Sequence, residues 1–235
     1  VSGETLILTK KGYVPIVELQ DKDVEVWNGN EWSEVTVKQT APLRHLITVF
    51  FSNGCSLTCT PDHKFIVGNG PLKQAERIPA QFLTPGMELR KEKLPIIDGE
   101  EPFLYPYLHG AMCAFGCFTE RGPIMDIMGP ALYSIINHSD MINTETGTKV
   151  FPDDLPMPYL VPINSSIEVK LQWLAGFFDT RAFDSEIGLT LVSVNHKLLQ
   201  DIQLLLTTLG IYSSNEHNNA VKVPLLEGEN VSISN

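Results

Sequence analysis

The sequence of 235 residues predicts a mainly β fold that is interrupted by an α/β block. Residues 1–97 contain short β-rich runs separated by glycine-containing turns, at a density that is typical of an all-β unit. Residues 98–215 contain apolar, helix-compatible stretches, and residues 216–235 return to strand-like sequence. The sequence therefore predicts three segments, with boundaries after residues 97 and 215.

The β block is expected to open with a strand over residues 5–9. Residues 24–37 predict a hairpin, because the turn Asn28-Gly29-Asn30 stands between two β-rich runs. Asn-Gly accepts the positive φ that a tight hairpin turn requires. Residues 46–60 predict a second hairpin around Asn53-Gly54.

The middle block mixes helices with strand. Helices are expected over residues 105–118, 171–178 and 195–209, and a strand over residues 187–192. The helix over 195–209 is the clearest, since leucine and isoleucine recur there at helical spacing and Gly210 can end it. The last segment, 216–235, is expected to return one or two strands to the first β block.

The composition excludes several classes of protein. Hydrophobic residues make up 43% and charged residues 19%, so the chain can form packed cores. No run approaches the ~18 apolar residues of a membrane helix, and the first residues resemble no secretory signal. Four cysteines do not make a disulfide scaffold in a chain of this length. We therefore expect an intracellular, cytoplasmic protein with free thiols.

The charge distribution argues against DNA binding. Residues 1–97 carry 11 basic and 11 acidic side chains, whereas residues 98–215 carry 5 basic and 14 acidic ones, within a total net charge of -11. An acidic segment repels a phosphate backbone, because DNA affinity comes largely from Lys and Arg.

Two segments of the β block resemble the splicing motifs of the Hint (hedgehog/intein) fold. Residues 3–9 (GETLILT), with Gly12 and residues 14–16 (VPI), are similar to the N-terminal motif. Residues 57–66 (LTCTPDHKFI) are similar to the second motif, a Thr-x-x-His where a strand enters a turn. Their order and spacing indicate an intein, and an unrelated β domain is the alternative.

The resemblance implies roles in protein splicing, which starts by converting a peptide bond into a thioester or ester. The planar amide resists this step, and its nitrogen leaves poorly unless it is protonated. By the resemblance, His63 would protonate the nitrogen of the scissile bond and Thr60 would hold the same site through its hydroxyl. Two interpretations of Asp62 remain open: a group that orients His63, or a solvated carboxylate in a turn.

Both ends of the chain depart from the family pattern. The family's nucleophilic Cys or Ser would stand immediately before Val1, which itself has no nucleophilic atom. At the other end, Asn235 matches the asparagine that cyclises, but Ser234 stands where histidine is usual. We favour a missing final motif over cyclisation of Asn235. The chain is therefore expected to be an inactivated or incomplete form.

Residues 174–182 (LAGFFDTRA) resemble the LAGLIDADG helix of homing endonucleases, and residues 108–116 (LHGAMCAFG) would be its partner. In that family the second acid of each motif binds the catalytic metal. Those positions are Phe115 and Arg181 here, and Asp179 keeps only the earlier, structural acid. We therefore expect a degenerate LAGLIDADG-like α/β insertion over 98–215 that has no endonuclease activity.

No metal site and no external cofactor are expected. The pairs Cys55/Cys59 and Cys113/Cys117 share a Cys-x3-Cys spacing that invites a zinc interpretation. We place the two pairs in different blocks, where cysteine serves as a small core residue.

The resemblance thus implies a single-turnover, self-processing element that excises itself by acyl shift, transesterification and Asn cyclisation. The alternatives are a cleavage-only Hint autoprocessing domain, a homing endonuclease, which Phe115 and Arg181 argue against, and a binding module without chemistry. The implied partners are the flanking extein segments in cis and, if the final motif is missing, a separate C-terminal intein segment.

Overall fold

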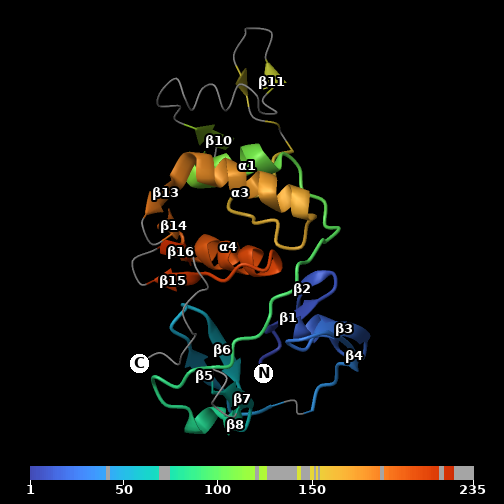
Figure 1. The fold of residues 1–235 in the computed structure, drawn as a ribbon. Helices are drawn as coiled ribbons and strands as arrows, with labels where there is room; N and C mark the ends of the chain where they lie inside the picture. The colour runs from blue at the N-terminus through green and yellow to red at the C-terminus, as the bar shows by residue number, and fades with distance from the viewer. Residues whose placement is uncertain are drawn as a thin grey trace.

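Figure 1 shows the computed structural model, which describes residues 1–40, 43–68, 75–119, 122–125, 142–143, 149–150, 152, 154–185, 188–216 and 220–224. These residues form two units. The first unit (residues 1–91) is built from short strands, and the second unit (residues 102–224) contains the α-helices. A connecting segment (residues 92–101) joins the two units.

An antiparallel sheet with the strand order β2-β1-β3-β4 opens the first unit. Its elements are β1 (Leu6–Thr9), β2 (Gly12–Pro15), the 3-10 helix η1 (Ile16–Leu19), β3 (Asp23–Trp27) and β4 (Trp32–Thr36). The Asn28 side chain accepts hydrogen bonds from the backbone N–H groups of Asn30 and Glu31, and Gly29 has a φ of 99°. This turn chemistry confirms the hairpin that the sequence predicts at 24–37.

Two more hairpins complete the first unit. They consist of β5 (Ile47–Phe50) with β6 (Ser56–Cys59), and of β7 (Lys64–Val67) with β8 (Glu76–Pro79), followed by the 3-10 helix η2 (Ala80–Phe82). A small core of Val49, Cys59, Phe65 and Ala80 holds these hairpins together. The predicted hairpin at 46–60 is therefore confirmed.

Helices α1 (Pro106–Phe115) and α3 (Ile167–Arg181) pack against each other at short range in the second unit. A Cβ atom on Gly110 would lie 2.1 Å from the carbonyl oxygen of Trp173, and one on Gly176 would lie 2.0 Å from that of Tyr107. Only glycine permits such an approach of two backbones.

The helix that the sequence predicts at 105–118 is shorter in the structure, because the chain continues as strand β9 (Gly116–Thr119) after Phe115. None of the helices in the described part of the chain is long and apolar enough to cross a membrane.

Helix α4 (His196–Thr208) lies between the α1–α3 pair and the first unit in Figure 1. The Asn195 side chain caps its start by accepting a hydrogen bond from the backbone N–H of Leu198 at 3.1 Å. Its apolar face is buried as the sequence predicts, through Leu198, Leu199, Ile202, Leu205 and Leu206. The same core includes Trp173 and Phe177 of α3.

The sheet of the second unit has the strand order β13-β14-β16-β15. Its strands are β13 (Ala182–Ser185), β14 (Gly188–Val192), β15 (Ser214–Glu216) and β16 (Ala220–Pro224). Two short ribbons, β9 (Gly116–Thr119) with β10 (Gly122–Met125) and β11 (Ile142–Asn143) with β12 (Lys149–Val150), accompany it.

The structure places β16 differently from the sequence-based boundary after residue 215. This strand pairs with β14 and β15 inside the second unit, and does not join the sheet of the first unit. Val221 is fully buried in the core shared with α4, which accounts for the pairing. Residues 225–235, including Asn235, lie outside the described residues.

The connecting segment is fixed along the second unit. The backbone N–H of Ile97 donates to the carbonyl oxygen of Thr208 at 2.8 Å, and the buried Lys170 Nζ donates to the carbonyl oxygen of Ile97 at 2.7 Å. The Asp98 carboxylate accepts a hydrogen bond from the first backbone N–H of α3, at Ile167. These hydrogen bonds therefore fix the connecting segment against the second unit.

Candidate functional site

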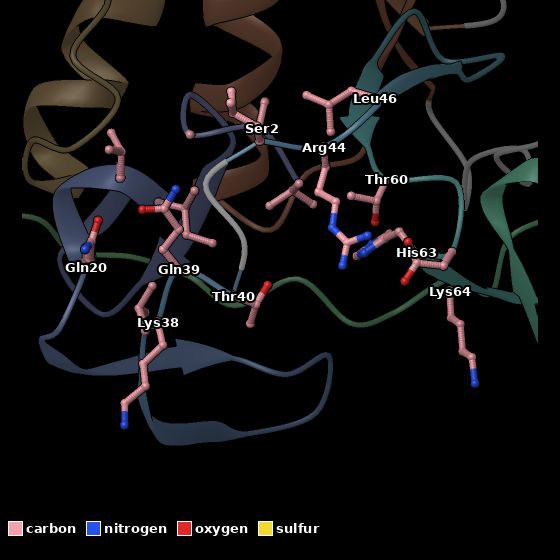
Figure 2. Close-up of a pocket in the computed structure, with 17 residues that line it drawn as sticks. Ser2, Gln20, Lys38, Gln39, Thr40, Arg44, Leu46, Thr60, His63 and Lys64 are labelled. Carbon is pink, nitrogen blue, oxygen red and sulfur yellow. The ribbon is translucent and has the colours of Figure 1, made fainter.

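A pocket of about 720 Å³ lies in the first unit, at the start of the chain. Its lining comes from residues 1–3, from residues 16–20 after β2, from residues 37–40 and 43–46 between β4 and β5, and from residues 60–64 after β6. Figure 2 shows the side chains of these stretches, with those of Lys38 and Lys64 extending away from Arg44 and His63. Because the stretches come from different strands, the pocket depends on how the hairpins sit relative to one another.

The residues predicted from the second splicing motif all line this pocket. Thr60, Asp62 and His63 follow β6 in a turn that is closed by a hydrogen bond from the His63 backbone N–H to the Thr60 carbonyl oxygen, at 3.0 Å. Val1 and Ser2 line the same pocket. The structure therefore brings the start of the chain and the predicted residues together, and leaves Asn235 undescribed.

Backbone hydrogen bonds hold the first residues between the two walls of the pocket. The backbone N–H of Ser2 donates to the carbonyl oxygen of Thr58 on β6 at 3.0 Å. On the opposite side, the backbone N–H of Val17 donates to the carbonyl oxygen of Gly3 at 3.0 Å. The direction in which the chain enters at Val1 is thereby fixed.

The imidazole of His63 is half-buried and packs edge-on against Phe65, with ring centroids 5.3 Å apart. Burial lowers the pKa of His63, and the nearby Asp62 carboxylate opposes this effect. At neutral pH the ring is therefore uncharged, and it can accept a hydrogen bond at one nitrogen and donate one from the other.

Asp62 is exposed, and its strongest interaction is with Thr60. A hydrogen bond from the Thr60 side chain lowers the pKa of Asp62, with smaller contributions from its own backbone and from Arg44. The carboxylate influences the pKa of His63 less than burial does. The structure thus favours a solvated turn carboxylate over a group that orients His63.

The pocket also has basic side chains that the sequence does not predict. Lys38, Arg44 and Lys64 line it, and Figure 2 shows the side chain of Arg44 extending toward His63. Residues 37–46 show neither periodicity nor a motif, so only their place between two hairpins could have singled them out.

The second unit shows how the predicted LAGLIDADG-like helices end. Phe115 and Arg181 are the last residues of α1 and α3. Asp179 accepts a hydrogen bond from the Tyr107 hydroxyl at 2.8 Å, and burial together with this bond raises the pKa of Tyr107 to about 12. Asp179 therefore joins the two helices.

Within the described ranges, no group of three or more His, Cys, Asp or Glu side chains is arranged to hold a metal ion. Cys55, Cys59 and Cys113 are free thiols. Cys59 is fully buried, which raises the pKa of its thiol, whereas Cys55 faces the second unit and contacts Gln203.

Comparison with known proteins gives one informative similarity. No family model matches the chain. Over 240 aligned residues, the chain is 37% identical to a ribonucleoside-diphosphate reductase large subunit from Invertebrate iridescent virus 6. The alignment covers 91% of this chain and 25% of the relative, so the chain spans about a quarter of the relative's length.

This similarity contradicts the predicted intein and its protein-splicing function, together with the cleavage-only and endonuclease alternatives. The relative is named as the large subunit of a reductase and not as a protein-splicing element. Identity across 91% of the chain outweighs motifs of a few residues, since a pattern such as Thr-x-x-His has little specificity of its own. The positions of Thr60 and His63 in the pocket stand independently of that assignment.

Proposed function

We propose that this chain is a region of a longer polypeptide and that its pocket binds, in cis, the polypeptide segment joined to Val1. The observation that carries the proposal is the convergence of Val1, Thr60 and His63 on one pocket. The 25% coverage of the relative supports a longer polypeptide. The flanking segments of that polypeptide are then the partners of this chain.

The polar groups of the pocket suit an extended peptide. Each peptide unit brings one N–H donor and one C=O acceptor, and both need partners when they leave water. The neutral imidazole of His63 supplies a donor and an acceptor, and Arg44 supplies further donors. In this proposal Thr60 and His63 hold the segment, and no bond is broken.

The similarity favours a second, broader candidate for the whole polypeptide. The relative is named for the reduction of ribonucleoside diphosphates. We propose that a longer polypeptide containing this chain has that activity. An intracellular, cytoplasmic location belongs to the same proposal, as does the expectation that the chain does not bind DNA, because both rest on the sequence.

We also propose a fold type for each of the two units. The strands of the first unit support a Hint-type fold, and the close α1–α3 pair supports a LAGLIDADG-type second unit. These assignments rest on the sequence resemblance and on these two features.

Amide hydrogen exchange tests the binding proposal. The chain is extended by the residues that precede Val1 in its own reading frame, and exchange is followed by NMR. A bound segment should exchange about tenfold or more slowly than the same segment as a free peptide. Free-peptide rates in the extended chain would overturn the proposal.

A histidine pair provides the matched control. His63→Ala should abolish most of the protection, because it removes a side chain that lines the pocket. His45→Ala should retain it, since His45 is exposed and stands outside the lining although it lies in the neighbouring loop. Equal protection in the two variants would show that the segment is held elsewhere.

A further inference from the structure

The two hairpins that carry opposite walls of the pocket are both held by the second unit. Strand β2 runs directly into Ile16 and Val17 on one wall, and β6 runs directly into Thr60 on the other. The second unit contacts the first hairpin at Tyr13 and the second hairpin at Asn53. Tyr13 lies three residues before Ile16, and Asn53 lies seven residues before Thr60.

Asn164 holds the first hairpin by pairing with its backbone. Its Nδ2 donates to the carbonyl oxygen of Tyr13 at 3.0 Å, and its Oδ1 accepts from the backbone N–H of Tyr13 at 2.8 Å. The carboxamide thus replaces a neighbouring strand at this position of β2. A Cβ atom on Gly12, which has a φ of 111°, would lie 2.1 Å from the same Oδ1, so the fit requires glycine there. The Tyr13 hydroxyl also meets the Thr207 hydroxyl of α4 at 2.9 Å.

Gln203 holds the second hairpin in the same manner. Its side chain is almost fully buried, and its Nε2 donates at 2.9 Å to the carbonyl oxygen of Asn53 in the β5–β6 turn. The same Nε2 donates to the carbonyl oxygen of Ser213, which fixes the carboxamide against its own unit. Its Oε1 accepts the thiol of Cys55 at 3.5 Å. Buried amide groups with this many partners are costly to disturb.

We infer that the second unit is a clamp that sets the width of the pocket, with Asn164 and Gln203 as positioning residues that fix its two walls. The walls meet across residues 1–3, through the Ser2–Thr58 and Val17–Gly3 hydrogen bonds. A shift of either hairpin would stretch these bonds and expose His63 further to water. The inference rests on the proposed function only for the identity of what the pocket binds.

The test compares Asn164→Ala, Gln203→Ala and the double variant with Gln172→Ala. Gln172 is an exposed amide on α3 whose side chain donates a hydrogen bond to its helix neighbour Glu168, so it is the matched control. Exchange of the Ser2 and Val17 amides should accelerate about tenfold in each clamp variant. The pKa of His63, measured by NMR, should rise toward its ordinary value, since burial is the main cause of its depression.

Two results would overturn the clamp. In the first, all three clamp variants match Gln172→Ala, both in the pKa of His63 and in the exchange rates of the Ser2 and Val17 amides. The other is equal acceleration throughout β3 and β4, which pair with each other and, among the described residues, make no hydrogen bond to the side chain of either clamp residue, because that would indicate general destabilisation. These readouts need no bound segment. Failure of the extended wild-type chain to protect its segment would therefore reject the proposed function alone.

Discussion

At the scale of single residues, His109 shows how a buried ring fixes its own protonation state. It is fully buried on α1, and its Nδ1 accepts the indole N–H of Trp173 at 3.0 Å. Since an indole only donates, Nδ1 carries no proton, and Nε2 donates to the carbonyl oxygen of Met157 at 3.0 Å. Burial lowers the pKa of His109, so the folded chain holds the neutral ring.

Stability should therefore fall in mild acid. Below pH 6.5 the unfolded chain takes up a proton at His109 that the folded chain refuses, so the free energy of unfolding decreases as the pH falls. The slope is at most about 1.4 kcal/mol per pH unit and ends at the folded pKa. Urea denaturation at several pH values should show this slope in the wild type and in His45→Ala, and a shallower one in His109→Gln. An unchanged slope in His109→Gln would contradict the assignment.

At the scale of elements, the contact of α1 with α3 depends on two glycines. In Gly176→Ala the new Cβ would meet the Tyr107 carbonyl oxygen at 2.0 Å, so the helices must move apart. Alanine favours a helix by ~1 kcal/mol over glycine, yet overpacking should dominate and lower the free energy of unfolding by about 1–3 kcal/mol. Leu171→Ala, at an exposed position of α3, should change it by less than about 0.5 kcal/mol. Denaturant unfolding of both variants measures these free energies. A Gly176→Ala variant that is more stable than the wild type would refute the close packing.

Elements whose causes are local could be predicted, and those that depend on distant partners could not. The hairpin at 24–37 follows from the Asn28 turn, and α4 follows from its apolar spacing and the Asn195 cap. From the sequence, strand β16 is expected to return to the first unit, because no local signal shows that it pairs with β14 in the second unit. The same limit applies to the site: Thr60 and His63 share one turn, whereas Asn164 meets Tyr13 across 151 positions of sequence.

At the scale of the whole molecule, one polypeptide region contains a pocket and the unit that holds its walls. All residues that line the pocket belong to the first unit, and Asn164 and Gln203 of the second unit hydrogen-bond to the hairpins that carry its walls. The similarity to a quarter of a reductase large subunit places such a region within a much longer polypeptide in that relative.

The central claim is that the pocket holds the segment joined to Val1 without breaking the bond between them. Intact mass of the complete polypeptide, purified after expression with both flanks, tests this most directly. We predict a single species whose mass includes this 26.1 kDa region. A separate species of about 26.1 kDa, accompanied by joined or free flanks, would contradict the claim and would show that the Thr60–His63 site processes the chain.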